Sequence, residues 1–292
     1  MSHGSRLTCT RMRSVICKNF TLEYFSIGSN GPRGERGSVE MALDPDPERM
    51  LLQNLDGILP ADEVHIWRAD LSFPKNGLDT LRELLAPGDH DRAARFEQPG
   101  LRNQFLFTRA FLRLTLGRYL QVEPRELQFR TTRYGKPEIS NFPDIQFNLS
   151  HSGKVAALAI VRARRVGVDV EQIRDNVDPI ELASRFFSPR EIGWLQAQPD
   201  SERLSSFFVC WTAKEAYLKA LGEGLSISLS RFGLIPSEGN SGFELEFYDN
   251  RKESRRWSIC QLSLGPDLRG AVAVEGTNCR ICLGTWQPEI PR

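Results

Sequence analysis

The sequence predicts an α+β fold made of two similar α+β subdomains, each an antiparallel sheet packed with helices. Two observations lead to this prediction. Segments with helical spacing of apolar residues are followed by groups of short segments in which apolar and polar residues alternate. This order occurs twice along the 292 residues, which can bury one large core or two smaller ones. We interpret the repeated pattern, which has no counterpart in a repeated sequence, as pseudo-two-fold symmetry.

The composition is that of an ordinary globular protein, with 40% hydrophobic and 26% charged residues. A formal net charge of +1 gives no reason to expect nucleic acid or a membrane as a partner. The longest apolar run, residues 155–161, is far shorter than the roughly 20 residues of a membrane helix, and we find no secretory signal. Scattered cysteines, with a single C-x-x-C at Cys279 and Cys282, fit free thiols better than a zinc site. We therefore expect a cytoplasmic protein.

Three parts are expected along the chain. Residues 1–40 are rich in Gly, Ser and Arg without hydrophobic periodicity, so they are predicted to be a disordered extension, and Met41 is an alternative start. We assign residues 60–164 to an N-terminal subdomain and residues 165–285 to a C-terminal subdomain. The charged connector at residues 163–165 separates the two.

The first subdomain is expected to open with a strand at residues 63–71, where apolar and polar residues alternate. Residues 89–120 have the apolar spacing of a helix, and a Gly-Lys-Pro turn follows at residues 135–137. Two further strands, residues 144–150 and 154–161, complete this half.

The second subdomain is expected to open with a strand at residues 167–173. Residues 179–196 are predicted to form two short helices, because Ser188 can cap a new helix that has proline at its first position. A long helix then runs from about Ser205 to Leu221 and ends at Gly222. The tail alternates again in three segments, at residues 243–248, 256–264 and 270–276.

Two carboxylates lie within the apolar run GVDVE. Residues two apart in a strand point to the same side, so Asp169 and Glu171 project together. They repel each other unless a cation lies between them or water covers that face. A hard cation such as Mg²⁺ binds through one or two carboxylates together with phosphate and water. The alternative is an edge strand with a solvated outer face.

The helical segment WTAKEAYLKA carries charge among apolar residues. Glu215 and Lys219 are four apart and share a stripe with Trp211, while small and aromatic residues cover much of the remaining surface. A buried carboxylate and ammonium imply a site or a structural pair. The alternative is an ordinary ion pair on the surface, which contributes a few tenths of a kcal/mol.

Several basic or polar residues could face an anion. The turn Ser150-His151-Ser152-Gly153 is small and polar, which suits a phosphate-facing loop, although a lone histidine is often structural. Lys136 lies in a fixed turn, and Arg109 and Arg113 form a basic stripe; the alternative for these three is a solvated surface. Together with the carboxylates, they are the groups that bind a polyphosphate through Mg²⁺ and move a phosphoryl group.

Four motifs in this order resemble those of the 4′-phosphopantetheinyl transferases: FNLSHSG, GVDVE, FFSPRE and WTAKEAYLKALGEGL. The similarity extends from about Val64 to Val274 and is to the larger, pseudo-dimeric, surfactin-synthetase type. It implies an active site between the two subdomains and a monomeric protein. It also implies that the 4′-phosphopantetheine arm of coenzyme A is transferred to a serine of an apo acyl or peptidyl carrier protein, and that 3′,5′-ADP leaves.

The resemblance implies roles in metal binding and catalysis. Asp169, Glu171 and Glu215 match ligands of Mg²⁺, with Mn²⁺ as an alternative because both ions take oxygen ligands. Glu215 and Lys219 match catalytic groups of the family. Glu191 matches a glutamate proposed to help deprotonate the attacking serine.

The resemblance also implies contacts to coenzyme A. Lys219 and His151, with Ser150 beside them, match groups on its phosphates, and Lys136 matches a lysine near the adenine and 3′-phosphate. A looser alignment of the helical region adds three arginines as coenzyme A contacts: Arg92, Arg95 and Arg113.

Two other classes of protein compete with a transferase. A non-catalytic module that binds a carrier protein or coenzyme A would have lost a metal ligand or the lysine, and this chain keeps Asp169, Glu171, Glu215 and Lys219. A Mg²⁺-dependent nucleotide hydrolase lacks any phosphate-binding loop in this sequence. For the carrier protein, the aromatic residues of FFSPREIGWL are expected either to form an apolar docking contact or to be core.

Overall fold

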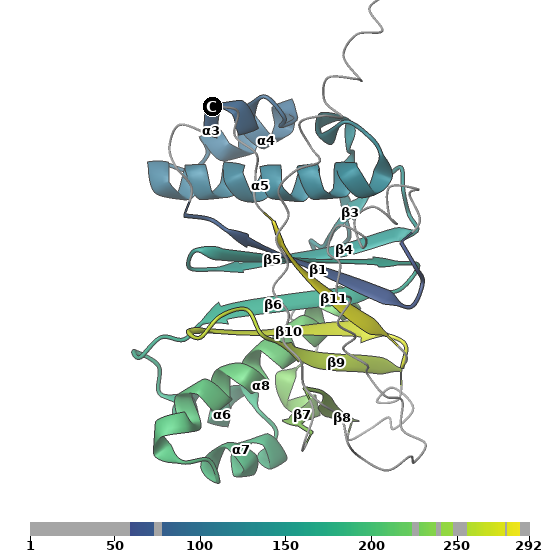
Figure 1. The fold of residues 1–292 in the computed structure, drawn as a ribbon. Coiled ribbons are helices and arrows are strands. Elements are labelled where there is room, and N and C mark those ends of the chain that lie inside the picture. Colours follow the sequence, from purple (N-terminus) through teal and green to yellow (C-terminus); the bar gives the residue numbers. More distant parts are fainter. Residues whose placement is uncertain are drawn as a thin grey trace, which may run out of the picture.

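The computed structural model describes residues 59–72, 78–223, 228–237, 241–247, 256–277 and 279–286. The extension predicted for residues 1–40 and the alternative start at Met41 lie outside these ranges. Figure 1 shows four layers: helices, a sheet, a second sheet, and helices again. The predicted α+β class with sheets packed against helices is therefore confirmed. Within the described ranges, no helix combines the length and hydrophobicity needed to cross a membrane.

The first sheet has the strand order β11-β1-β5-β4. Strands β1 (Glu63–Asp70), β5 (Val155–Arg162) and β4 (Ile145–Ser152) pair antiparallel, whereas β11 (Arg280–Trp286) pairs with β1 in parallel. This differs from the expectation in two ways. The sheet is not purely antiparallel, and its edge strand comes from the end of the chain, although the sequence placed residues up to 285 in the second subdomain.

Helix α5 (Pro99–Leu120) covers the outer face of the first sheet, and α3 (Leu78–Arg82) and α4 (Pro87–Ala94) pack against α5 (Figure 1). The helix predicted over residues 89–120 is thus two helices. Gln98 takes an extended conformation before Pro99, and a residue that precedes proline disfavours helical backbone. Below α5, the short helix η3 (Pro124–Glu126) leads into the hairpin of β2 (Phe129–Thr131) and β3 (Pro137–Ile139).

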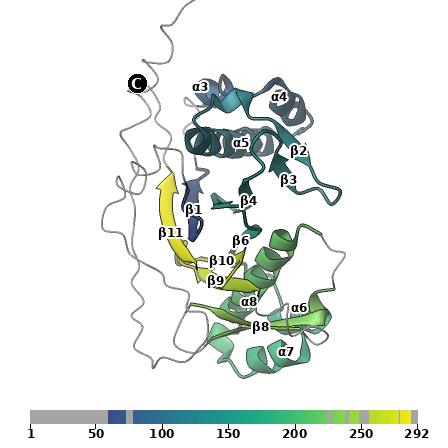
Figure 2. The ribbon, with the colours of Figure 1, turned by 90° about the vertical axis from the view of Figure 1, so that its right-hand side faces the viewer.

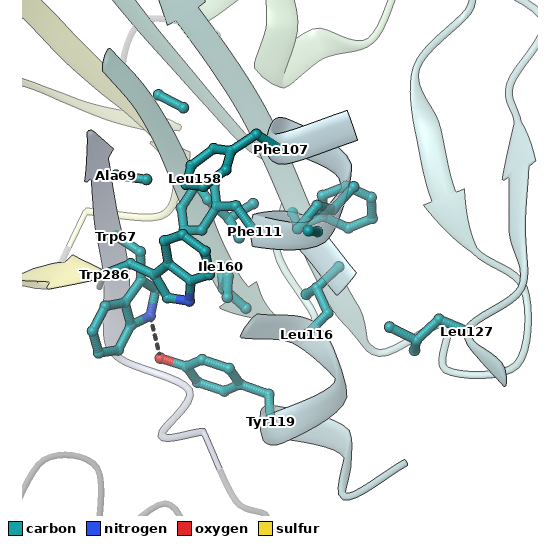
Figure 3. Close-up of a cluster of buried hydrophobic side chains, with 14 of the residues drawn as sticks. Trp67, Ala69, Phe107, Phe111, Leu116, Tyr119, Leu127, Leu158, Ile160 and Trp286 are labelled. Carbon is teal, nitrogen blue, oxygen red and sulfur yellow. Dashed lines mark hydrogen bonds between the residues drawn. The ribbon is translucent and has the colours of Figure 1, made fainter. Parts of the chain in front are cut away.

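The core of the first half lies between α5 and the sheet (Figure 3). Phe107 and Phe111 of α5 pack against Trp286 of β11, with ring centroids 5.5 and 5.0 Å apart. Trp67 Nε1 donates a hydrogen bond of 2.8 Å to the Tyr119 hydroxyl, which satisfies a polar group that would be costly to bury alone.

A buried polar network joins β1, β11 and α5. The two ring nitrogens of His65 lie 2.6 Å from Glu63 Oε2 and 2.6 Å from the Tyr119 hydroxyl, and Arg280 forms an ion pair with Glu63. Ligand atoms of Glu63, His65 and Cys282 lie within 4.8 Å of one another. Because their polar atoms already have protein partners, we interpret this group as a cross-link between the three elements.

The second sheet has the order β6-β10-β9, with β6 (Val166–Gln172), β10 (Leu268–Glu275) and β9 (Trp257–Leu262) antiparallel. Helix α8 (Asp200–Leu221) covers its outer face, beside the helices α6 (Pro179–Phe186) and α7 (Pro189–Gln196) (Figure 2). The remaining elements are η5 (Leu229–Arg231), β7 (Phe232–Pro236) and β8 (Phe243–Phe247).

The predicted helix boundaries of the second half agree with the structure at Ser188, Pro189 and Gly222, and differ at the start of α8. Ser188 caps α7 in a capping box with Glu191, and Pro189 is the first helical residue. Gly222 ends α8 with a φ of 72°, a left-handed conformation that glycine adopts without steric cost. Helix α8 begins at Asp200, ahead of the predicted start near Ser205.

The two sheets pack face to face through small apolar side chains, among them Ala157 and Ala159 of β5 and Val166, Val168 and Val170 of β6. Strands β4 and β6 belong to different sheets but are joined by side chains of β4. The hydrogen bonds come from alternate residues of β4. Asn148 accepts from the Val168 amide, and the Ser150 hydroxyl donates to Asp169. The Ser152 hydroxyl donates to Glu171 and accepts from the Gln172 amide. This ladder fixes the register between the two halves.

Candidate functional site

The expected site residues come together where β4, β6 and α8 meet. Gly167 of β6 makes this possible, because a Cβ there would lie far inside van der Waals contact with the Ala216 carbonyl oxygen and the Ala220 nitrogen of α8. The helix backbone therefore lies directly against the strand. As a result, Lys219 of α8 reaches Asp169 of β6.

Asp169 is the most buried carboxylate of the site, with a side chain only 4% exposed. Its Oδ1 accepts bonds from Lys219 Nζ at 2.5 Å and from the Ser150 hydroxyl at 2.9 Å. Lys219 Nζ also donates to Ser150 at 3.0 Å. The second oxygen, Oδ2, is buried and has no hydrogen-bond partner among the described residues. A buried carboxylate oxygen without a donor is costly, which indicates a position made for a bound cation.

The other two carboxylates flank Asp169. Glu171 accepts a bond from the Ser152 hydroxyl at 2.8 Å, and the half-buried Glu215 has no hydrogen bond to any described residue. Burial raises the pKa of Asp169 and of Glu215, and the pKa of Glu215 is raised further by the charges of Asp169 and Glu171. Lys219 lowers both pKa values but does not offset the effect. The three carboxylates thus repel one another, as a cation site requires.

These residues fit a hard divalent cation in chemistry, since all the donors are oxygens and one of them is an unpartnered buried atom. The oxygens of the three carboxylates do not all lie within 4.8 Å of one another. Within the described ranges, the group that meets this limit is Glu63, His65 and Cys282 of the first sheet.

His151 is exposed at the end of β4, beside this cluster. Neighbouring protein atoms lower the pKa of His151, the Lys219 charge lowers it further, and Glu171 opposes both. The imidazole is therefore mostly uncharged at neutral pH.

Lys136 does not point to solvent, as the alternative interpretation of its turn held. Its ammonium donates to the carbonyl oxygens of Val166 and Lys219, each at 2.9 Å, and more weakly to that of Ala220 at 3.4 Å. Burial lowers the pKa of Lys136 to about 8. The turn of the β2–β3 hairpin is thereby joined to the end of α8.

Glu191 occupies a different environment from the one expected for a base. Its side chain and that of Lys214 are both 0% exposed, and Lys214 Nζ lies 2.8 and 2.7 Å from the two carboxylate oxygens. The amides of Ser188 and Leu234 donate to the same oxygens. With each oxygen accepting two bonds away from solvent, Glu191 has no position for a serine proton.

Arg113 likewise differs from the expectation of a coenzyme A contact or a solvated stripe. It is buried and donates to Asp89 at 2.5 Å and to the carbonyl oxygens of Pro124 and Leu127. Arg109 shares Asp89 at 2.8 Å. The two arginines tie α4, α5 and the segment before β2 together. By contrast, Arg92 and Arg95 of α4 are exposed.

Comparisons with known proteins decide the family. Residues 165–274 match the model of the 4′-phosphopantetheinyl transferase superfamily, and residues 74–162 match that of the N-terminal part of 4′-phosphopantetheinyl transferases. The chain is 37% identical over 235 residues to the 4′-phosphopantetheinyl transferase HetI of Nostoc sp., which covers 79% of this chain and 92% of that protein. The chain belongs to the 4′-phosphopantetheinyl transferase superfamily.

The chain is also similar, over shorter stretches, to another relative and to a solved structure. The phosphopantetheinyl transferase Sfp of Bacillus subtilis is 31% identical over 162 residues, covering 55% of this chain and 71% of that protein. Among solved structures, the Thermotoga maritima holo-[acyl-carrier-protein] synthase matches 39% of this chain and 63% of its own, with 20% identity and a TM-score of 0.32.

Sequence reasoning missed several parts of the site in this phosphopantetheinyl transferase. Asn148 and Ser152 join β4 to β6, and Gly167 sets the distance from β6 to α8. A signal existed for the first two, because small polar residues recur two apart in NLSHS. None existed for Gly167, whose neighbours come from a helix about fifty residues away.

Proposed function

We propose that this protein transfers the 4′-phosphopantetheine arm of coenzyme A to a serine hydroxyl of an apo acyl or peptidyl carrier protein. The serine oxygen forms a bond to the phosphorus that bears the pantetheine, the pyrophosphate bond breaks, and 3′,5′-ADP leaves. One observation carries the proposal. In a member of this superfamily, Asp169 and Lys219 of the second half meet Ser150 of the first, and among described residues one buried Asp169 oxygen has no partner.

Asp169, Glu171 and Glu215 would hold Mg²⁺, with Mn²⁺ as an alternative. When bound, the ion neutralises charge on the oxygens of the pyrophosphate. The basic residues of the site would complement the remaining negative charge of the coenzyme A phosphates. Lys219 carries an ammonium that already contacts both Asp169 and Ser150, so a phosphate oxygen at Ser150 would lie beside it.

The end of β4 would face the phosphates of coenzyme A. His151 and Ser150 lie there, next to the positive φ of Gly153, which opens the turn. Arg92 and Arg95, being exposed, stay as proposed contacts. Arg113 is withdrawn as a contact because its side chain is buried and its Nε and Nη1 groups already donate inside the protein.

The proton of the attacking serine needs an acceptor, and we assign that role to Glu215. Its half-buried carboxylate has no hydrogen bond to a described residue, so the oxygen that does not hold the cation is available. Glu191 is assigned instead to a structural pair with Lys214.

We further propose that residues 60–164 and 165–285 form the two subdomains, apart from β11, and that the protein acts as a monomer. The carrier protein would dock near α6 and α7. There Phe186 is 37% exposed and available for contact, whereas Phe187 is buried core.

Intact mass spectrometry of an apo carrier protein tests the proposal. Incubation with this protein, coenzyme A and Mg²⁺ should add about 340 Da, the mass of the arm, and EDTA should abolish the gain. Bound coenzyme A without any mass gain, across several carrier types, would favour a binding module. Cleaved coenzyme A with an unchanged carrier would favour a hydrolase.

A further inference from the structure

The ammonium of Lys136 closes the C-terminal end of α8. The last carbonyls of a helix have no partner within the helix, and they carry partial negative charge. Lys136 Nζ donates to two of them, those of Lys219 and Ala220, and to the Val166 carbonyl at the start of β6. One side chain from the first half thus holds both the helix and the strand of the second half.

The turn that carries Lys136 is itself fixed. The Lys136 amide donates to the Thr132 hydroxyl at 3.1 Å, and the Thr132 amide donates to the Lys136 carbonyl at 2.9 Å. The segment before this hairpin is held by buried Arg113, which donates to the Leu127 carbonyl at 2.9 Å. The Lys136 side chain therefore extends from a turn that is held by hydrogen bonds on both sides.

The residue that Lys136 holds is part of the proposed site. The Lys219 carbonyl accepts from Lys136, while the Lys219 ammonium contacts Asp169 and Ser150. Glu215 lies one helical turn earlier on the same helix. A shift of about 1 Å in the end of α8 would move both groups relative to Asp169, and misplacement of that size can cost about a hundredfold in rate.

We propose that Lys136 is a positioning residue: it holds the end of α8 on β6 and so places Lys219, and it keeps these carbonyl contacts when coenzyme A binds. This proposal rests on the proposed transferase function. It differs from the role that the resemblance implies, in which the Lys136 side chain supplies charge to coenzyme A.

Steady-state kinetics of Lys136→Met separates the two roles. Loss of positioning should lower kcat at least about tenfold and leave KM for coenzyme A within about threefold, because the transition state is affected and ground-state binding is not. A rise of tenfold or more in KM with kcat retained would overturn the proposal, as would unchanged values of both.

Two further variants control for folding and charge. Arg133→Met removes a positive charge from the same turn, where Arg133 stacks over Tyr134, and should behave like the wild type. Lys136→Gln keeps N–H donors for the carbonyls but brings no charge. Its kcat should exceed that of Lys136→Met, whereas a raised KM for coenzyme A in this variant would contradict positioning even if Lys136→Met does not fold.

A readout without activity distinguishes failure of this inference from failure of the proposed function. Amide hydrogen exchange at residues 216–222 should be faster in Lys136→Met than in Arg133→Met, because the end of α8 loses its anchor. Equal exchange in the two variants would refute the anchor, whatever the wild-type protein does to a carrier.

Discussion

Helix α8 presents two lysine–carboxylate pairs that differ in almost every physical respect. Lys214 and Glu191 are sealed, with both side chains 0% exposed, whereas the Lys219 side chain is 31% exposed next to Asp169. All three N–H donors of Lys214 are used, two on Glu191 and one on the Phe232 carbonyl. In the second pair, among described residues, Lys219 has two acceptors and Asp169 Oδ2 has no donor.

The difference separates a structural pair from a functional one. A saturated pair has no capacity for a ligand, so its charges only hold α7 and β7 against α8. An unsaturated pair keeps unfavourable energy in an unpartnered oxygen, which a bound cation can remove. Sequence type and spacing do not show this difference, since both pairs consist of a lysine of α8 and an acidic residue distant in sequence.

The strongest test of the comparison is Asp169→Asn. Transfer should fall by about a thousandfold or more, since the variant loses a metal ligand and the partner of Lys219. Stability should change by less than about 1 kcal/mol, because Asn fills the same volume without a buried charge. Turnover and urea unfolding measure the two effects. Glu275→Gln, in the second sheet beside Arg165 and Arg256, is the control and should keep full activity. Near-wild-type turnover of Asp169→Asn at saturating Mg²⁺ would refute the metal assignment.

Lys214→Met should have the opposite pattern of effects, with a large loss of stability and a small loss of transfer. Loss of the ammonium leaves Glu191 charged and buried, which should lower the free energy of unfolding by about 3–5 kcal/mol. The folded fraction at low temperature should retain turnover within about tenfold, since the Lys214 ammonium is bonded to Glu191 and Phe232 and not to the carboxylates of the site. The double variant Glu191→Gln/Lys214→Met should be more stable than Lys214→Met. If urea unfolding shows the two to be equal, an unpaired charge is not the cause of the loss.

Gly167→Ala tests the contact that brings the second pair together. A Cβ would collide with the backbone of α8 at Ala216 and Ala220, so the helix must move away from β6. We expect a loss of about 1–3 kcal/mol in stability and a disproportionate loss of transfer. Gly193→Ala, where a Cβ meets nothing within 4 Å, is the matched control. Unchanged transfer in Gly167→Ala would show that the close approach does not set the site.

The smallest expected effect concerns His151. Its pKa lies below the usual value, so the free protein is mostly neutral there at pH 7. A phosphate beside it should raise that pKa, so binding of coenzyme A should be accompanied by proton uptake at this residue. Affinity should therefore increase as pH falls from about 8 to about 6. Titration calorimetry in buffers of different ionisation enthalpy measures the uptake, and uptake that persists in His151→Gln would assign the proton to another group.

Local physics made much of this fold predictable. The alternation in GVDVE placed Asp169 and Glu171 on one side of a strand, and the Ser-Pro signal located the start of α7. The expectations that the structure did not bear out concern contacts between segments distant in the sequence. The structure does not show the alternative, a surface ion pair of Glu215 with Lys219: Lys219 pairs with Asp169, which the tight contact at Gly167 brings within reach. The burial of Arg113 likewise depends on Asp89 of another helix.

The parallel pairing of β11 with β1 has a consequence for how the molecule is made. The sheet of the first half lacks its outer strand until residues 280–286 have been synthesised, so the half whose synthesis begins first is completed only after the second half. A gene split after residue 164 would yield an N-terminal fragment with the edge of β1 exposed, and its partner fragment would have to supply the missing strand. The two halves are therefore not separable modules, because each depends on the other for a strand of its sheet or for residues of its site.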